Sequence, residues 1–291
     1  MKATPHLERS SWIAGIIGAI AGIIGLGYTI IAFHRPQPSD LSQNHNSNVL
    51  IEGDRTYIAG DWNLDKAQDI AESILKSASW VEITSEKAAL EQHALVGEFN
   101  LVYSLSEGMI LVYASKNDGD DCHACAPYLS FFEFDKNDKK WVLMKTTIAG
   151  IHDGAFGEPP FVNVFPIAND KYGVFLELNE IHQGWTVGGT RIFTQMGDSF
   201  REVFHIITSQ GKPEGTSGFS SWHSVLALKP TITGLYDIEV TRKGARGPKD
   251  LVFMDGRDEL KDAIANSDGN VRPYDLYKFN GQRYVRALNF K

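Results

Sequence analysis

Both cysteines of this chain lie in one short motif, CHAC, at residues 122–125. A C-x-x-C spacing is compatible with covalent haem, thiol redox chemistry, metal binding or a local disulfide. Covalent haem requires a histidine directly after the second cysteine, where this chain has Ala126. A redox pair works best at a helix N-terminus, which lowers the pKa of the first thiol. The residues from Tyr128 onward read as a strand instead, and the second ligand pair that a zinc site needs is missing.

We therefore expect a structural disulfide between Cys122 and Cys125. A bridge between residues i and i+3 closes a very small loop, so it stabilises the folded chain by only about 2 kcal/mol. Its use would be to fix the bend that enters the strand at Tyr128. Two alternatives stay open: a thiol–disulfide oxidoreductase and a metal-binding protein, both using this motif with His123.

Two further loops combine histidine, glycine and aromatic residues. GIHDGAFGEPPF contains His152 and Asp153, and EIHQGWTVGGT contains His182 and Trp185. Such a composition is typical of pocket rims, where the backbone approaches a ligand. Glycine-rich turns without a ligand have the same composition. Together with His123, these side chains are the candidate binding residues, and we expect neither a cofactor nor a resident metal.

One basic stretch, RKGARGPK, spans residues 242–249 of an otherwise acidic domain. Its glycines and charges predict a solvated hairpin tip. Contact with a phosphate group or with a partner is the alternative.

One segment near the start of the domain has helical periodicity. In NLDKAQDIAESILKSASW, Asn63 is the expected N-cap, and apolar residues from Leu64 onward recur on one face. SEKAALEQHAL, from Ser85, is a second short helix candidate.

Beyond about residue 98 the sequence predicts short strands rich in β-branched and aromatic residues, separated by polar turns. The expected strands are FNLVYSL, MILVYAS, YLSFFEF, KWVLMKT, FVNVFPI, YGVFLELNEI, TRIFTQ, FREVFHII, SVLALK, YDIEVTR, DLVFM, DLYKF and RYVRAL. Few helices lie between them, so a parallel βαβ plan is excluded. We expect a mainly β fold of antiparallel hairpins, as a sandwich, a barrel or an irregular propeller-like array, with one or two short N-terminal helices.

A single transmembrane helix precedes this domain in our interpretation. Residues 12–33 carry no charged side chain, and a helix of that length measures about 33 Å, enough to cross a hydrocarbon core of about 30 Å. The apolar stretch is too long for a cleaved signal and lacks a cleavage site. We divide the chain into a cytoplasmic tail (1–9), a signal-anchor (10–33), a flexible linker (34–50) and an extracytoplasmic β-rich domain (51–291).

Lys2 and Arg9 precede the apolar segment and only Arg35 follows it closely, which places the N-terminus in the cytoplasm. We therefore expect a single-pass protein of the inner membrane with its C-terminal domain in the periplasm or outside the cell. The pair Gly18 and Gly22 has the spacing that lets two membrane helices pack closely, so self-association is a further expectation.

Residues 51–291 are acidic. Residues 1–50 contain three of the 28 Lys and Arg and two of the 36 Asp and Glu, which leaves a net charge of −9 on the rest. Such a domain has no bulk basic field to attract nucleic acid. No complete catalytic set appears in the sequence, so we favour binding or scaffolding in the bacterial envelope over catalysis. The ligand would be an envelope protein or a small molecule.

The motif CHACAP, followed by an aromatic strand, a charged turn and Trp141, resembles a group of uncharacterised bacterial proteins. Members of the group share a Cys-His-x-Cys-Ala-Pro motif, a Gly-rich region similar to GIHDGAFGEPP, and a late YDIEV and Y-x-F-x-G-x-x-Y ending. The likeness covers roughly residues 65–288. It implies an extracytoplasmic β-rich domain and carries no assigned activity.

Overall fold

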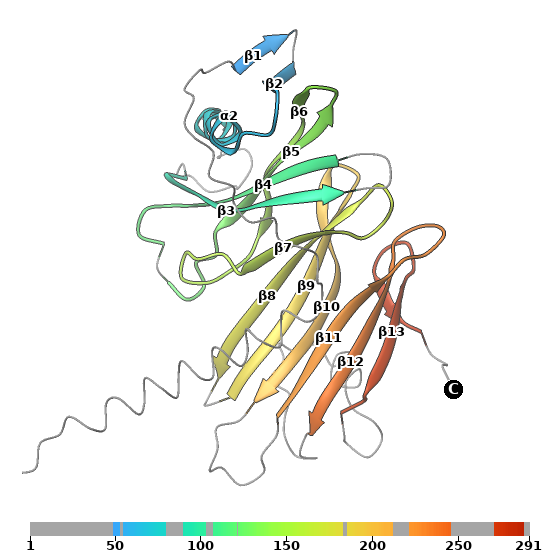
Figure 1. Ribbon diagram of the computed structural model, residues 1–291. Coiled ribbons are helices and arrows are strands. Elements are labelled where there is room, and N and C mark those ends of the chain that lie inside the picture. The colour runs from blue at the N-terminus through green and yellow to red at the C-terminus, as the bar shows by residue number, and fades with distance from the viewer. Residues whose placement is uncertain are drawn as a thin grey trace, which may run out of the picture.

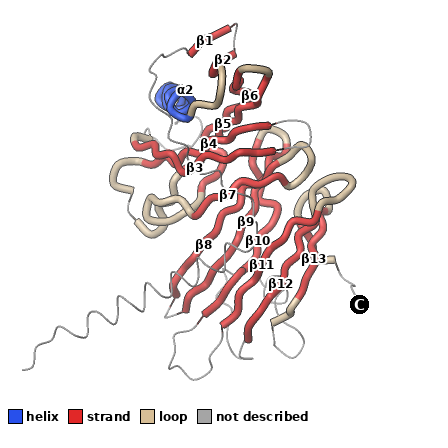
Figure 2. Tube along the Cα trace, viewed as in Figure 1, coloured by secondary structure: helices blue, strands red, loops and turns tan. Residues whose placement is uncertain are grey.

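The computed structural model describes residues 49–52, 55–79, 90–102, 107–120, 122–182, 185–211, 221–245 and 271–287. This part of the chain forms two antiparallel β-sheets and one helix (Figures 1 and 2). Six strands make the first sheet, in the order β1-β2-β6-β5-β4-β3, and eight make the second, in the order β14-β13-β12-β11-β10-β9-β8-β7. The prediction of a mainly β fold built from antiparallel hairpins is confirmed.

The strands are β1 (Val49–Glu52), β2 (Arg55–Ala59), β3 (Gln92–Val102), β4 (Glu107–Lys116), β5 (Tyr128–Asn137), β6 (Lys140–His152), β7 (Phe161–Pro166), β8 (Tyr172–His182), β9 (Trp185–Met196), β10 (Ser199–Gly211), β11 (Ser221–Lys229), β12 (Asp237–Ala245), β13 (Tyr274–Phe279) and β14 (Tyr284–Arg286). All expected strands except DLVFM coincide with one of these, and residues 250–254 lie outside the described part. The strands form two large sheets rather than repeated four-stranded blades. Strand β1 begins at Val49, inside the segment that we assigned to the linker.

Helix α2 (Leu64–Ser77) confirms the first helix prediction and its cap. The side chain of Asn63 accepts a hydrogen bond from the backbone N–H of Lys66 at 2.9 Å, which satisfies one of the free donors of the first turn. Ala67 and Leu75 lie on its buried face, which packs against the six-stranded sheet (Figure 1). The second helix candidate is wrong where it can be checked: residues 92–95 belong to strand β3, and residues 81–89 lie outside the described part.

The six-stranded sheet is buried on both faces at its centre. Along β4, Met109, Leu111 and Tyr113 share a core with α2, whereas Ile110 and Val112 share a core with strands of the other sheet. The alternation follows from the two-residue period of a strand. A run of apolar residues without polar interruption, such as MILVYA, therefore indicates a strand that is covered on both sides.

The eight-stranded sheet folds over on itself. Strand β10 pairs with β11 only through Ser209–Gly211, and the remaining lengths of the two strands separate. The rings of Phe204 on β10 and Tyr277 on β13 have centroids only 4.9 Å apart. Strands three places apart in a flat sheet lie about 14 Å apart. Strands β7–β10 and β11–β14 therefore form two layers with an apolar core between them.

No helix among the described residues is long and apolar enough to cross a membrane. The expected span, residues 10–33, lies outside the described part, as do Gly18 and Gly22.

Candidate functional site

The two cysteines form a disulfide in the connection between β4 and β5. Cys122 and Cys125 are joined, with their Cα atoms 5.0 Å apart, as the sequence predicts. The backbone N–H of Cys125 also donates to the carbonyl oxygen of Cys122 at 2.9 Å, so a tight turn accompanies the bridge. Strand β5 begins three residues later, at Tyr128. We call residues 122–127 the cysteine loop.

A second loop, residues 152–158, lies against the cysteine loop, and we call it the glycine loop. The backbone N–H of Phe156 donates to the carbonyl oxygen of Cys122 at 3.0 Å, and that of Gly157 donates to the carbonyl oxygen of Cys125 at 2.6 Å. The N–H of Asp153 donates to the carbonyl oxygen of Pro127 at 3.3 Å. Both ends of the disulfide turn therefore accept hydrogen bonds from the glycine loop.

This close approach requires glycine at two positions. Gly157 has a φ of +70°, and a Cβ placed on it would lie 2.3 Å from the carbonyl oxygen of Asp120. Gly154 has a φ of +124°, and its Cβ would lie 2.2 Å from the carbonyl oxygen of Glu158 in the same loop and 2.9 Å from Cδ of Pro127 in the cysteine loop. Only a residue without a side chain fits both the backbone conformation and the space. The glycines that the sequence marked as candidate rim positions thus bring two backbones together.

Between these glycines, Phe156 is exposed on the surface. Its φ of +55° is in the left-handed region, which a phenylalanine rarely adopts, and 53% of the residue is exposed to solvent. The ring of His123 contacts the Phe156 ring edge to face, with centroids 4.9 Å apart. An aromatic pair from two different loops therefore forms the outer surface of the paired loops.

His152 has a different role from His123. Its ring stacks on Tyr128 with centroids 4.1 Å apart and an angle of 7° between the planes. Nε2 of His152 lies 2.9 Å from the carbonyl oxygen of Ala126, where it is placed to donate. These contacts hold the end of β6 to the cysteine loop. His152 therefore lies where the two loops meet, and it is exposed to solvent.

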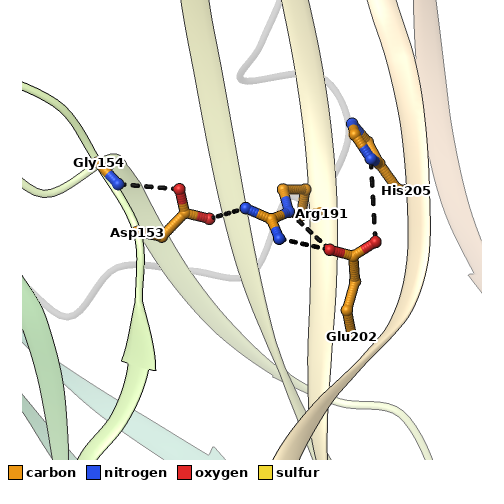
Figure 3. A network of polar contacts seen from close by, with 5 residues as sticks. All are labelled: Asp153, Gly154, Arg191, Glu202 and His205. Atoms are coloured by element: carbon orange, nitrogen blue, oxygen red, sulfur yellow. Dashed lines mark hydrogen bonds and ion pairs between the residues drawn. The ribbon is translucent and has the colours of Figure 1, made fainter. Parts of the chain in front are cut away.

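Asp153 connects the glycine loop to the eight-stranded sheet (Figure 3). One carboxylate oxygen accepts the backbone N–H of Gly154 at 2.8 Å, and the other accepts Nη1 of Arg191 at 2.5 Å. Arg191 also donates to Glu202 through Nε and Nη2, at 2.8 and 2.5 Å, and His205 lies beyond, with Nδ1 3.9 Å from Glu202. The guanidinium group of Arg191 thus lies between two carboxylates, as Figure 3 shows.

The other two predicted residues are in a different place. His182 ends β8 and Trp185 begins β9, where they form the last pair of the β8–β9 hairpin. Trp185 precedes Arg191 by six residues, or about 20 Å along an extended strand. The fold therefore does not bring this hairpin to the paired loops. The side chains of His182 and Trp185 lie outside the described part.

Sequence reasoning did not single out Phe156, Arg191 or Glu202. Phe156 lies in the motif GAFG, directly before Gly157 and two residues after Gly154, and these two glycines are the only local signal for a turn there. Arg191 and Glu202 become neighbours of Asp153 only through the pairing of β9 with β10 and the packing of the two sheets.

The groups at the paired loops limit the chemistry that is available there. In the oxidised state the two sulfur atoms bond to each other, and they are not thiolates that can ligate a metal. In the part of the chain that the structure describes, no group of three His, Cys, Asp or Glu side chains is placed to hold a metal ion. The exposed groups of the paired loops include the rings of His123 and Phe156 and the side chain of Glu158.

No known protein family, no curated protein and no solved structure matches this chain.

Proposed function

We propose that this chain is a membrane-anchored binding or scaffolding protein of the bacterial envelope, and that the paired loops are its recognition surface. The observation that carries the proposal is the conformation of Phe156. Its backbone is left-handed and it is exposed, while its own N–H and that of Gly157 donate hydrogen bonds to the disulfide turn. A strained backbone at a non-glycine residue costs about 1–3 kcal/mol and persists only where the surrounding structure enforces it.

Stability alone gives no reason for that cost. A glycine at position 156 would adopt the same φ without strain, and an exposed ring contributes little burial. A rigid aromatic ring that is already fixed in place loses little side-chain entropy on binding, which is why aromatic residues dominate the energetics of protein interfaces. The strain and the exposure of Phe156 are therefore both explained by contact with a partner.

The location outside the cytoplasm rests on the sequence and on redox chemistry. The uncharged segment 12–33 is the proposed anchor. A disulfide persists in the periplasm or outside the cell, and cytosolic reductants would reduce it. The resemblance to uncharacterised bacterial proteins with a Cys-His-x-Cys-Ala-Pro motif points to the same compartment.

Affinity capture from membranes of the native host tests the proposal. The bait is the full chain, compared with Phe156→Ala and with Met144→Ala as the matched control, because Met144 is equally exposed on β6 away from the loops. We expect proteins that the unaltered chain and the Met144 variant enrich equally and that the Phe156 variant loses. The same set with all three baits would contradict the proposal. Protease treatment of spheroplasts tests the location separately, since an extracytoplasmic domain is digested while the membrane is intact.

Thiol–disulfide exchange is the second candidate, because Cys122 is exposed and an attacking thiolate can reach its sulfur. Equilibration with glutathione buffers separates the two functions. A structural disulfide has a reduction potential below about −300 mV, whereas exchange catalysts lie between about −120 and −270 mV.

A further inference from the structure

Arg242 is completely buried, although the sequence predicts a solvated basic turn for residues 242–249. It lies on β12, two residues after Val240, and its side chain has no exposed surface. Ile238 and Val240 face the core between the two layers of the eight-stranded sheet, and the strand period places Arg242 on the same face. Residues 246–249 lie outside the described part.

Three arginine side chains surround one buried carboxylate, that of Asp275. Nη1 of Arg242 donates to the carboxylate of Asp275 at 2.5 Å, and this acid is 4% exposed. The same carboxylate lies 3.4 Å from Nε of Arg272 and 3.9 Å from Nη1 of Arg286. One acid therefore meets three guanidinium groups. We call these four residues the arginine cluster.

Several buried donors at the cluster meet no acceptor among the described residues. They are Nε and Nη2 of Arg242 and Nη1 of Arg286. The hydroxyl of Ser224 and the indole N–H of Trp222 are also buried without a partner there. Ser224 lies directly opposite Arg242 in the pairing of β11 with β12, and Trp222 lies diagonally opposite Arg242 on the same face. Ser224 and Trp222 therefore both adjoin the cluster.

Leaving such donors unsatisfied is costly, because a buried charged group without a hydrogen bond loses its hydration and gains nothing in return. Tyr277 supplies no counter-charge. Burial raises the pKa of its hydroxyl, which keeps it neutral, and a hydrogen bond with Arg242 opposes that shift. Within the described part of the chain, Arg242 and Arg286 therefore keep buried N–H donors without an acceptor, beside the Ser224 hydroxyl and the Trp222 indole, and an acceptor-only anion is their complement.

We propose that the arginine cluster binds a tetrahedral oxyanion of the phosphate class, either free or as the head of a phosphate ester. Guanidinium groups match phosphate oxygens through paired N–H donors. Among the described strands β14 is the last of its sheet, and the side chains of Arg286 and Arg272 beside it are 28% and 21% exposed, so this edge is the side of the cluster that reaches solvent. This site lies in the β11–β14 layer and does not involve the paired loops.

Thermal unfolding of the full chain in detergent, titrated with inorganic phosphate against sodium chloride of equal ionic strength, tests the site. We expect a saturable rise of the melting temperature with phosphate and none with chloride. Arg286→Gln should weaken phosphate binding by about tenfold or more, the effect of losing one charge-assisted hydrogen bond. Lys278→Gln is the matched control, since Lys278 pairs with Asp237 on the exposed face of β13 and should leave binding unchanged.

Glycerol phosphate in a parallel titration distinguishes the sources of the anion. Tighter binding of inorganic phosphate indicates a free anion, and tighter binding of the ester indicates a phosphorylated ligand.

Equal responses to phosphate and chloride would overturn the proposal, and so would a phosphate response that Arg286→Gln does not alter. Arg286 is part-exposed, so its variant tests the site even if Arg242→Gln fails to fold. The Phe156→Ala variant should bind phosphate as the unaltered chain does. A negative result at the arginine cluster would therefore leave the proposal for the paired loops unaffected, and the reverse also holds.

Discussion

Phe156 donates its backbone N–H to the carbonyl oxygen of Cys122, so the exposed aromatic residue is fixed directly to one half of the disulfide. Gly157 repeats the contact with Cys125. The disulfide turn therefore supports the conformation of a loop that is about 30 residues away in the sequence. This relationship gives the small disulfide a purpose beyond its own modest stabilisation.

Replacing both cysteines by serine should loosen the glycine loop more than the domain. The expected loss in the free energy of unfolding is about 2 kcal/mol, because the bridge closes a very small loop. Hydrogen exchange followed by mass spectrometry should show faster exchange of the Phe156 and Gly157 amides, with β4 unchanged as the internal reference. Unaltered exchange at both amides would mean that the disulfide does not support the loop.

Gly157→Ala should disrupt the contact between the paired loops. The added Cβ meets a backbone carbonyl at Asp120, in addition to the strain of a positive φ. Gly197→Ala is the matched control, because Gly197 has a φ of +68° with nothing within 4 Å of the added atom. The control variant should lose about 1 kcal/mol in the free energy of unfolding, as any L-residue does in that conformation. Gly157→Ala should lose clearly more, because its Cβ also meets the carbonyl oxygen of Asp120. Equal losses in chemical denaturation would show that the loops are not in close contact.

Asp153→Asn should detach the glycine loop from Arg191 while keeping an acceptor for Gly154. The contact is a charge-assisted hydrogen bond that is largely shielded from water, so we expect a loss of about 1–3 kcal/mol in urea denaturation. Glu107→Gln breaks an ion pair of similar length, with Lys136, that is well exposed, and should cost less than about 1 kcal/mol. A loss from Asp153→Asn no larger than that of the control would contradict the network in Figure 3.

Glu133 should make the domain less stable as the pH rises. Burial raises the pKa of its carboxyl group, while a hydrogen bond from the Tyr172 hydroxyl at 2.8 Å opposes the shift. Between the unfolded and folded pKa values of Glu133, the folded chain binds more protons than the unfolded chain. The contribution of this carboxyl group to stability is therefore fully present below the unfolded pKa of about 4.5, and it is lost as the pH rises through the folded pKa. Glu133→Gln removes this pH-dependent contribution, because glutamine does not ionise. The stability of the variant relative to the unaltered chain should therefore increase from pH 4 to pH 8, and a constant difference would refute the shift.

Much of the fold was predictable because strand and helix patterns are local. The periodicity after Asn63 predicts α2, and alternating apolar residues predict the hairpins. The proximity of the two loops was less predictable. The turn at Asp138 alone would place Ala149 opposite Tyr128, but two register shifts in the β5–β6 pair place His152 there instead. Bulges of this kind depend on tertiary packing and have no reliable sequence signal.

The burial of Arg242 was also beyond local pattern. RKGARG reads as a solvated turn because most basic glycine-rich stretches are exposed. Its principal partner, Asp275, is 33 residues away and becomes a neighbour only through the pairing of β12 with β13. The same reason explains Arg191, whose contacts with Asp153 and Glu202 depend on how the two sheets pack. Local sequence identifies the elements, and long-range pairing decides which charges meet.

Photo-cross-linking in cells of the native host tests the central claim most directly. Phe156→p-benzoylphenylalanine places a reactive group at the proposed recognition surface, and the same replacement of Met144 samples an equally exposed position on β6. The account predicts discrete adducts from position 156 that are absent from position 144 and that disappear when both cysteines are replaced by serine. Identical adducts at the two positions, or none at position 156, would contradict it.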